Sequence, residues 1–291
     1  MDNFIDVNQV LGYEFPLKQF RYDQRDVCLY ALGIGAGEDP MNIEELKFVY
    51  ELSPYFTPLP TLAVTFPFDA IGSITSVPGM QFNPMMLLHG EQRLELLRPL
   101  PIQATLTNRA IIKAVYDKGS GAVIVIEATS LDGHGEPLCR NTSHIFIRGL
   151  GGFGGERGPS GAKNVPPDRA PDVVVRQKTR ENQALLYRLA GDPNPLHADP
   201  AMAAWGNFPR PILHGLCTFG FAGRAVLAQF AGNEPSRVQS LECRFTRHVF
   251  PGETLVTEMW QVEAGRVLFQ VRVEERNEVV IANAAAAISE Q

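Results

Sequence analysis

The sequence predicts an α+β protein built from two similar halves, each with an antiparallel sheet, and one long buried helix. Three features lead to this prediction: β-type segments that follow one another in each half, an apolar segment at 214–230, and a Gly-rich stretch at 149–161. Near-alternation of apolar and polar residues rich in Val, Ile and Thr is typical of half-buried antiparallel strands. A helix that is apolar nearly all round must be buried, and a buried helix wrapped by an antiparallel sheet gives an α+β fold.

The strands are expected at equivalent places in the two halves. They are predicted at 108–116, 122–130 and 141–147, and again at 256–262, 266–274 and 279–288. The turns at 117–121 and 132–135 have the Asp and Gly residues of hairpin turns. Each half also carries a helix that leads into a Gly-containing turn, at 25–39 and at 179–199, with Tyr30 and Tyr187 in matching places. We interpret the halves as a diverged repeat.

The long helix is expected in the second half only. The segment 214–230 has a single charged residue, Arg224, whereas the matching region 59–77 contains several prolines and glycines. Proline at Pro67 would break a helix there. The first half has therefore lost or shortened its central helix, which would leave space for a ligand.

The Gly-rich stretch predicts the domain boundary. We expect a degenerate N-terminal domain at 1–148, a Gly/Pro-rich linker at 149–172 and a C-terminal catalytic domain at 173–291. Glycine at this density is entropically costly inside a helix or strand. The spacing of Gly149, Gly151 and Gly154 matches a dinucleotide-binding pattern, but the sequence that follows cannot start the helix that such a site needs.

Composition excludes several classes of protein. The chain has 291 residues, 45% hydrophobic, with 26 basic and 32 acidic residues for a net charge of −6. This is globular rather than disordered composition, and it disfavours nucleic-acid binding, which needs clustered cations. No apolar run approaches the roughly 20 residues that span a bilayer, so no membrane association is expected. The first residues are acidic, unlike a signal peptide, and residues 288–291 are not the peroxisomal Ser-Lys-Leu signal. The four cysteines lie far apart and form no CxxC pair. These features predict a cytoplasmic protein with reduced thiols.

The segment 187–200 is the one that indicates chemistry. Gly191 is a natural end for the preceding helix, and Pro193 and Pro195 stiffen the loop behind it. The loop carries Asp192, Asn194 and His197 within six residues. A carboxylate, an amide and an imidazole held together can bind one water, take a proton from it and return one.

This segment resembles the signature of the hydratase-2 and MaoC-like dehydratase family. That signature is an aromatic residue, then Ala/Ser-Gly-Asp-x-Asn-Pro-Leu-His, then small residues. The matching residues are Tyr187, Ala190, Gly191, Asp192, Asn194, Pro195, Leu196, His197, Ala201, Ala203 and Ala204. The resemblance extends over nearly the whole chain and implies a double hot-dog fold. It also implies (R)-specific hydration of trans-2-enoyl-CoA to (3R)-3-hydroxyacyl-CoA, or the reverse dehydration.

The resemblance also implies roles for particular residues. Asp192, His197 and Asn194 would be catalytic, with the backbone N–H of Gly215 binding the thioester oxygen. The matching positions of the first half, Gly35 and Pro40, cannot do acid–base chemistry, so one active site per chain is expected. Implied substrate contacts are His89, Gly90, Lys118, Pro193, Pro195, Leu196 and Phe245. The sequence leaves open which of Asp192 and His197 is the acid and which the base, and we interpret His214 as a capping or packing residue.

The same resemblance implies that no metal and no cofactor are needed, because CoA is part of the substrate. A small-molecule acyl-CoA substrate and a homodimer are expected, and space in the first half predicts medium, long or branched acyl chains.

Three alternatives stay open. An acyl-carrier-protein-linked 3-hydroxyacyl dehydratase would need a basic face for its acidic carrier. A hot-dog acyl-CoA thioesterase usually has an acid on the central helix, and 214–230 contains none. A non-catalytic acyl-CoA-binding protein would have no use for an intact Asp192 and His197.

Overall fold

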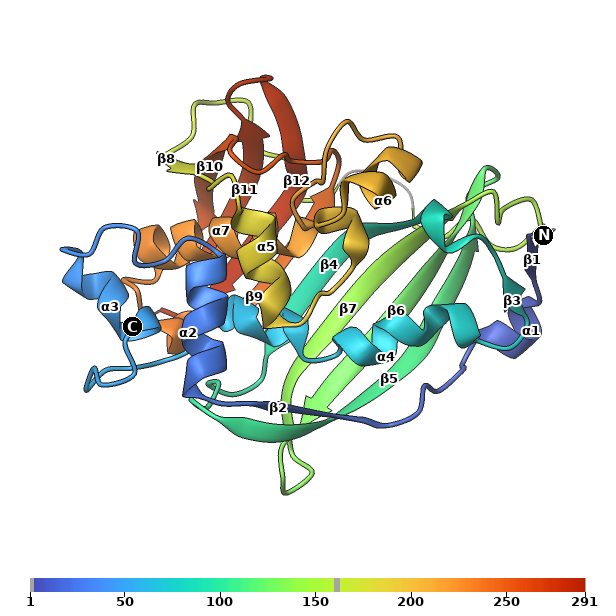
Figure 1. Cartoon of the computed structure of the whole chain (residues 1–291), viewed down its shortest axis with the longest axis horizontal. Coiled ribbons are helices and arrows are strands. Elements are labelled where there is room, and N and C mark those ends of the chain that lie inside the picture. The colour runs from blue at the N-terminus through green and yellow to red at the C-terminus, as the bar shows by residue number, and fades with distance from the viewer. Residues whose placement is uncertain (1–2, 160–162, 291) are drawn as a thin grey trace.

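The computed structural model describes residues 3–159 and 163–290, and it confirms the α+β fold (Figure 1). Its main feature is a ten-stranded antiparallel sheet in the order β2-β5-β6-β7-β4-β9-β12-β11-β10-β8. The first half contributes β2 Lys18–Tyr22, β4 Leu87–Leu96, β5 Ala104–Asp117, β6 Gly121–Leu131 and β7 Pro137–Arg148. The second half contributes β8 Val173–Lys178, β9 Val238–Phe245, β10 Thr254–Glu263, β11 Arg266–Val273 and β12 Glu278–Ile288. The order of the second half mirrors that of the first about the β4–β9 pair, as a diverged repeat requires.

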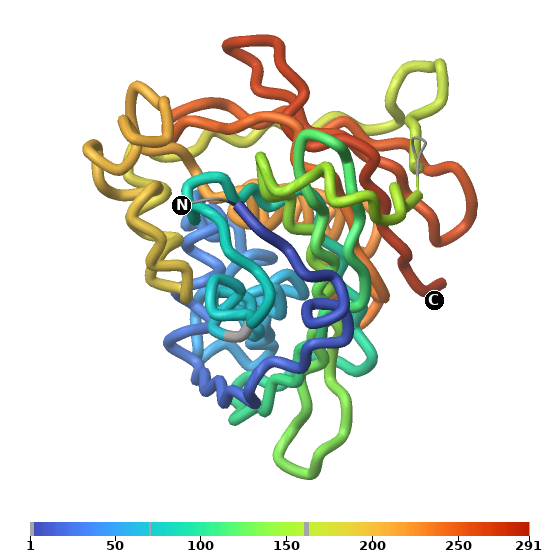
Figure 2. Tube along the Cα trace, turned by 90° about the vertical axis from the view of Figure 1, so that its right-hand side faces the viewer, coloured from blue at the N-terminus to red at the C-terminus, as the bar shows by residue number. Residues whose placement is uncertain are grey.

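Helices and short turns of 3-10 helix cover the inner face of this sheet. The α-helices are α1 Val7–Val10, α2 Gln24–Gly33, α3 Ile43–Val49, α4 Phe68–Gly72, α5 Gln183–Tyr187, α6 Pro200–Trp205 and α7 Gly215–Phe230. The 3-10 helices are η1 Pro60–Thr65, η2 Ser73–Ser76, η3 Pro84–Met86, η4 Arg188–Ala190, η5 Pro195–His197 and η6 Pro235–Arg237. β1 Phe4–Ile5 and β3 Met80–Gln81 form a separate small sheet. Figure 2 shows the C-terminal strands above and the green N-terminal strands to the right, with the helical segments in the angle between them.

The predicted central helix is α7. Its residues from Leu216 to Leu227 are buried, and it packs against β8 to β12. The charged residue in this helix, Arg224, is nearly buried and bonds to Glu45 of α3. In the part of the chain that the structure describes, no helix is long and apolar enough to cross a membrane.

The first half has short helical pieces where the second has α7. Pro67 lies between η1 and α4, and η2 follows α4 directly. Because proline cannot continue the hydrogen bonding of a helix, these pieces stay separate, as the sequence predicted. η1 packs directly on α7: a Cβ added at Gly223 would lie 2.7 Å from the methyl group of Thr61.

Helices α2 and α5 pair closely and fix the loop that follows α5. The rings of Tyr30 and Tyr187 lie 6.0 Å apart, and a Cβ added at Gly33 would lie 3.3 Å from the Cα of Tyr187. In the first half the loop after α2 runs against α7. At Gly35, which has a φ of +77°, an added Cβ would lie 2.5 Å from the ring of Phe221. Packing therefore requires glycine at the position that matches Asp192.

The Gly-rich stretch is bonded to the end of β5. The carboxylate of Asp117 accepts hydrogen bonds from the backbone N–H groups of Gly119, Gly152 and Gly154, at 2.7, 2.8 and 2.8 Å. Residues 160–162 of the predicted linker lie outside the described residues. The boundaries at 148 and 173 remain a prediction.

Candidate active site

The loop between α5 and α6 has the rigid shape that its sequence predicts. It leaves η4 at Gly191, whose φ of 127° is one that side-chain-bearing residues rarely adopt. Asn194 holds the next turn, because its Oδ1 accepts from the N–H of Leu196 at 3.0 Å and caps η5. Its own N–H donates to Oδ1 of Asp192 at 3.1 Å. Asn194 therefore positions the carboxylate through the main chain, while Pro195 starts η5.

Asp192 and His197 come together with a third side chain, His214. Each offers a polar atom, and these atoms all lie within 4.8 Å of one another. The rings of His197 and His214 stack with centroids 3.8 Å apart and an interplanar angle of 29°. His214 is the residue before α7, yet its side chain makes no capping hydrogen bond. Of the two roles expected for His214, capping is not seen, whereas the buried ring does pack, and its Nε2 also lies 3.3 Å from the carbonyl oxygen of Asp192.

Hydrogen bonding fixes the tautomer of His197. Its Nδ1 lies 2.9 Å from the carbonyl oxygen of Ile212. A carbonyl only accepts, so Nδ1 carries the proton and Nε2 keeps its lone pair. His197 thus presents a hydrogen-bond acceptor on the side of the ring away from Ile212.

Burial shifts the pKa of Asp192 and of His197. It raises the pKa of the Asp192 carboxyl to about 6, against a smaller lowering effect of the hydrogen bond from the Asn194 N–H. It lowers the pKa of His197 to about 4, partly countered by the bond to Ile212. At neutral pH His197 is therefore uncharged. Asp192 is mainly a carboxylate, and its pKa lies close to the pH of the solution. Such a group can both take and return a proton.

Gly215, Phe245 and His89 form a second cluster that adjoins the first. A Cβ added at Gly215 would lie 3.3 Å from the ring of Phe245, and the Phe245 and His89 rings meet edge to face with centroids 5.2 Å apart. Gly215 is exposed and is the first residue of α7. The first N–H groups of a helix have no partner within the helix and lie at its positive end. This N–H can therefore bind a developing negative charge.

The remaining predicted substrate contacts fall in two places. Gly90 lies at an irregularity in the β4–β7 pairing, where an added Cβ would lie 3.2 Å from the carbonyl oxygen of His144. Pro193 and Pro195 are exposed on the site loop, and Leu196 is partly buried there. Lys118 lies in the β5–β6 turn, where its ammonium donates to the carbonyl oxygens of Arg157 and Pro159. To bind CoA phosphates, Lys118 would have to exchange these carbonyl partners for the ligand.

Asp192, His197 and His214 are also the group, among the described residues, that could surround a metal ion. The Nε2 atom of His214 lies 3.3 Å from the carbonyl oxygen of Asp192, so it carries a proton. A cation bound at that nitrogen would have to displace this proton and its hydrogen bond.

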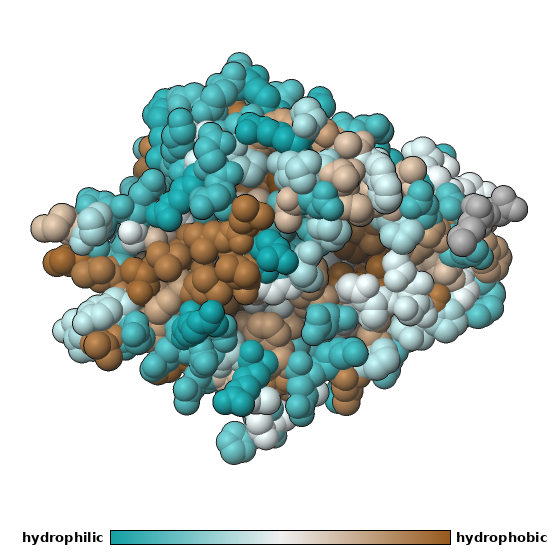
Figure 3. All heavy atoms as spheres, in the orientation of Figure 1, coloured by the Kyte–Doolittle hydropathy of each residue, from teal (hydrophilic) through white to brown (hydrophobic). Residues whose placement is uncertain are grey.

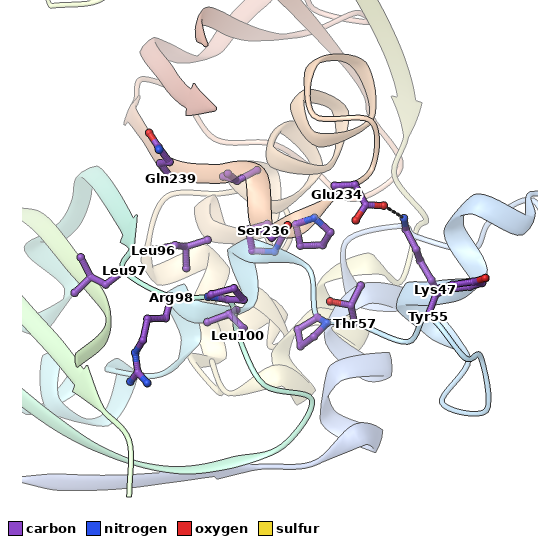
Figure 4. A pocket seen from close by; sticks show the side chains of 15 residues that line it. Lys47, Tyr55, Thr57, Leu96, Leu97, Arg98, Leu100, Glu234, Ser236 and Gln239 are labelled. Carbon is purple, nitrogen blue, oxygen red and sulfur yellow. Dashed lines mark hydrogen bonds and ion pairs between the residues drawn. The ribbon is translucent and has the colours of Figure 1, made fainter. Parts of the chain in front are cut away.

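The surface is hollowed beside the site loop. Figure 3 shows a hollow with an apolar floor between α6 and α4, over strands of the first half. A separate cavity of about 430 Å³ lies at the opposite end of β4 and β9 from His89 and Phe245 (Figure 4). Its lining includes Leu96, Leu100 and the ion pair of Lys47 with Glu234 at 3.1 Å. Asp192, His197 and His214 are not among the residues that line this cavity.

The buried histidines predict a loss of stability in mild acid. The pKa of His89 and of His197 is lowered by burial to about 4, so between pH 6.5 and 4 the unfolded chain takes up protons that the folded one does not. Each histidine then lowers the free energy of unfolding by up to about 1.4 kcal/mol per pH unit as the pH falls. Asp192, with its raised pKa, acts in the opposite direction and offsets one of them. Urea unfolding at several pH values between 7.5 and 5 checks this prediction. In His197→Gln the free energy of unfolding should depend less steeply on pH than in the wild type. An equal dependence in the two proteins would contradict the prediction.

Comparison with known proteins places the chain in a family. Residues 20–149 match the model of the MFE-2 hydratase 2 N-terminal domain, and residues 162–284 match that of the MaoC-like domain. A Dictyostelium discoideum protein named probable enoyl-CoA hydratase 2 is 45% identical, over 98% of this chain and 97% of its own. The peroxisomal enoyl-CoA hydratase 2 of Arabidopsis thaliana is 43% identical, over 97% and 95%.

Solved structures of similar fold support this family assignment. A MaoC-like dehydratase from Phytophthora capsici superposes with a TM-score of 0.88 at 38% identity, covering 99% of this chain and all of the other. A Mycobacterium tuberculosis protein described as having a double hotdog fold superposes with a TM-score of 0.59 at 15% identity, over 97% of each chain, and supports the fold alone.

One prediction from the sequence is wrong. We expected a cytoplasmic protein from its termini and cysteines, but the Arabidopsis relative, which matches nearly end to end, is named as peroxisomal. Short targeting signals are read by receptors and leave no trace in the fold, so the features used for the prediction could not decide the compartment.

The matches over the whole chain, together with the loop that brings Asp192 and His197 to the start of α7, show that the chain belongs to the hydratase-2 and MaoC-like dehydratase family.

Proposed function

We propose that the protein hydrates trans-2-enoyl-CoA to (3R)-3-hydroxyacyl-CoA, and that Asp192 moves the proton. The proposal rests on one observation. Asp192 and His197 share one rigid loop, and their polar atoms lie within 4.8 Å of that of His214, the residue before Gly215. The R hand follows from the family resemblance of that loop. The substrate is a small-molecule acyl-CoA, bound without nucleic acid or membrane.

The first step binds and polarises the thioester. Its carbonyl oxygen accepts a hydrogen bond from the Gly215 N–H at the positive end of α7. Phe245 packs over the backbone of Gly215 and leaves little room for a side chain there. The carbonyl can thus approach the N–H, and C3 becomes electrophilic as charge moves onto the oxygen.

One water then adds across the double bond. His197 Nε2 accepts one hydrogen bond from this water and orients it, and the Asp192 carboxylate accepts the other. The water oxygen forms a bond to C3 while its proton passes to Asp192, and the electrons of the double bond move to give the enolate oxygen at Gly215. Asp192 then gives the proton to C2 on the same face, which restores the carboxylate and completes the addition.

Labelled water tests this reaction. In water enriched in oxygen-18, the label should enter the 3-hydroxyl group of the product while the CoA thioester stays intact. Label in a free carboxylate, with release of CoA thiol, would mean thioester hydrolysis and would overturn the proposal.

The role of Asp192 predicts that both hydration and dehydration become slower at low pH. The dehydration also begins with the Asp192 carboxylate, which removes the C2 proton. Because the pKa of Asp192 is raised to about 6, kcat/KM should fall in both directions as the pH drops through this value. The check is a pH profile of hydration and dehydration. If hydration became faster in acid while dehydration slowed, Asp192 would act as an acid in the forward reaction and this assignment would fail.

The hollow beside the site loop supports a long acyl chain. It lies where α4, η1 and η2 replace a continuous helix, and its floor is apolar (Figure 3). We expect kcat/KM for trans-2-decenoyl-CoA to equal or exceed that for the four-carbon substrate. Turnover restricted to the four-carbon substrate would contradict this use of the hollow.

The proposed steps use no metal and no separate cofactor. Dialysis against EDTA should therefore leave kcat unchanged, whereas a Lewis-acid metal would contribute a large share of the rate. Loss of activity that added Zn²⁺ restored would show that Asp192, His197 and His214 hold a cation.

We also propose a homodimer. Exposed apolar residues lie on α3, in the loop before it, and on α5 with η4; they are Met41, Ile43, Leu185 and Leu189. Figure 3 shows a brown area on the side of the molecule where α2, α3 and α5 lie in Figure 1. A patch of this kind on a folded chain commonly marks an interface, and pairs with two-fold symmetry are the commonest assembly. Sedimentation equilibrium should give twice the mass of 32.1 kDa.

A further inference from the structure

His214 lies between the two candidate catalytic groups and the helix that carries Gly215. It is 1% exposed. One face of its ring stacks on His197 at 3.8 Å between centroids, and the ring of Tyr187 lies 5.0 Å away. Its Nε2 is 3.3 Å from the carbonyl oxygen of Asp192 and 4.0 Å from the carboxylate oxygen Oδ2 of the same residue.

These contacts fix the protonation of His214. Because the Asp192 carbonyl accepts, Nε2 carries the proton, and the lone pair is on Nδ1. Within the described residues, Nδ1 is buried without a hydrogen-bond partner. Burial is the main cause that holds the pKa of His214 well below its usual range, and the neighbouring His197 and Arg188 act in the same direction, because each would repel a positive charge on the ring. The ring is therefore neutral beside a neutral His197.

Packing alone does not account for a histidine here. A buried nitrogen without a partner destabilises the fold, and a phenyl ring would stack on His197 without that cost. What phenylalanine would lack is the N–H that donates to the main-chain carbonyl oxygen of Asp192 and lies 4.0 Å from its carboxylate. The polar atom that distinguishes histidine at this position is thus directed at the proposed proton carrier.

We propose that His214 is a positioning residue, which holds the main chain of Asp192 and the ring plane of His197 so that both face the same water. This rests on the proposed function and deepens it. Since His214 precedes Gly215 directly, one residue also links the loop that moves the proton to the N–H that binds the enolate oxygen. The hydrogen bond to Asp192 and the stacking on His197 thus connect the two parts of the site through His214.

Two substitutions separate these contacts. His214→Phe keeps the stacked ring and removes the N–H, whereas His214→Gln returns an N–H donor without the ring. We expect His214→Phe to lower kcat about 10- to 100-fold with little change in KM, because misplacing reacting groups slows the chemical step. His214→Gln should recover part of that loss. The acid limb of kcat/KM should move to higher pH in His214→Phe, since the Asp192 carboxylate loses a nearby donor.

Cys217→Ala is the matched control, because Cys217 is buried in the first turn of α7, three residues after His214, and its thiol faces the carbonyl oxygen of Gly33. It should keep kcat, KM and the pH profile of the wild type. If His214→Phe did the same while the wild type hydrates enoyl-CoA, the positioning role would be refuted and the proposed function would stand. If the wild type itself gave no hydration, the proposed function would fail first.

Spectroscopy tests the arrangement without any substitution. Nitrogen-15 NMR of the imidazoles at pH 7 should show a proton on Nε2 of His214 and on Nδ1 of His197. A proton on Nδ1 of His214 would break the bond to Asp192 and overturn the inference, even if the variants failed to fold.

Discussion

Replacing Asp192 with Asn is expected to lower kcat for hydration about 10²- to 10⁴-fold, the range of a lost general acid–base group. The amide has the shape of the carboxylate, and its oxygen can still accept the N–H of Asn194 that holds the loop. What it loses is the ability to take the proton of water. The thermal midpoint should be retained or rise slightly, because the buried charge is removed. Steady-state kinetics with trans-2-decenoyl-CoA measure the effect.

Asp199→Asn is the control for this variant. Asp199 lies on the same loop and caps α6 by accepting from the N–H of Ala201 at 2.8 Å, a bond that asparagine can also make. The control should keep the wild-type kcat. If Asp192→Asn retained a rate within a few-fold of the wild type, Asp192 would not be the proton carrier.

Replacing Gly215 with Pro is expected to lower kcat about 10²- to 10³-fold, as loss of one oxyanion donor does. Proline removes the N–H and is well tolerated at the first position of a helix. The residue before it, His214, already has φ −59° and ψ 135°, the extended conformation that a following proline requires. The helix should therefore form, and KM should change less than kcat.

Gly215→Ala separates the missing N–H from crowding. Alanine keeps the N–H and adds the Cβ that would lie 3.3 Å from the Phe245 ring. We expect its kcat to fall much less than that of the proline variant. Equal losses in the two variants would assign the effect to crowding against Phe245 and would remove Gly215 from the mechanism.

Local sequence patterns predicted most of the fold. Strands β5 to β7 and β10 to β12 were predicted from the alternation of apolar and polar residues and from hairpin turns. Helix α7 was predicted from a segment that is apolar nearly all round. The edge strands β2 and β8 were not predicted. Each is short, and three residues of each, Lys, Gln and Arg, are polar, so too few apolar residues remain to show alternation.

The sequence could predict which candidate residues lie together only where they share one stretch of chain. Asp192, Asn194 and His197 share a loop, so their proximity is local. The stacking of His214 on His197 depends on how α7 packs against the loop, which residue spacing does not contain. A signal was nevertheless present, since His-Gly occurs at 89–90 and again at 214–215, and both pairs adjoin Phe245 in the structure.

The hand of the product tests the central claim most directly. The purified protein and its Asp192→Asn variant would each be incubated with trans-2-decenoyl-CoA, and the 3-hydroxyacyl-CoA resolved on a chiral phase alongside an assay for free thiol. The wild type should give the 3R product without thiol, and the variant should give almost none. A 3S product, or free CoA without hydration, would contradict the account.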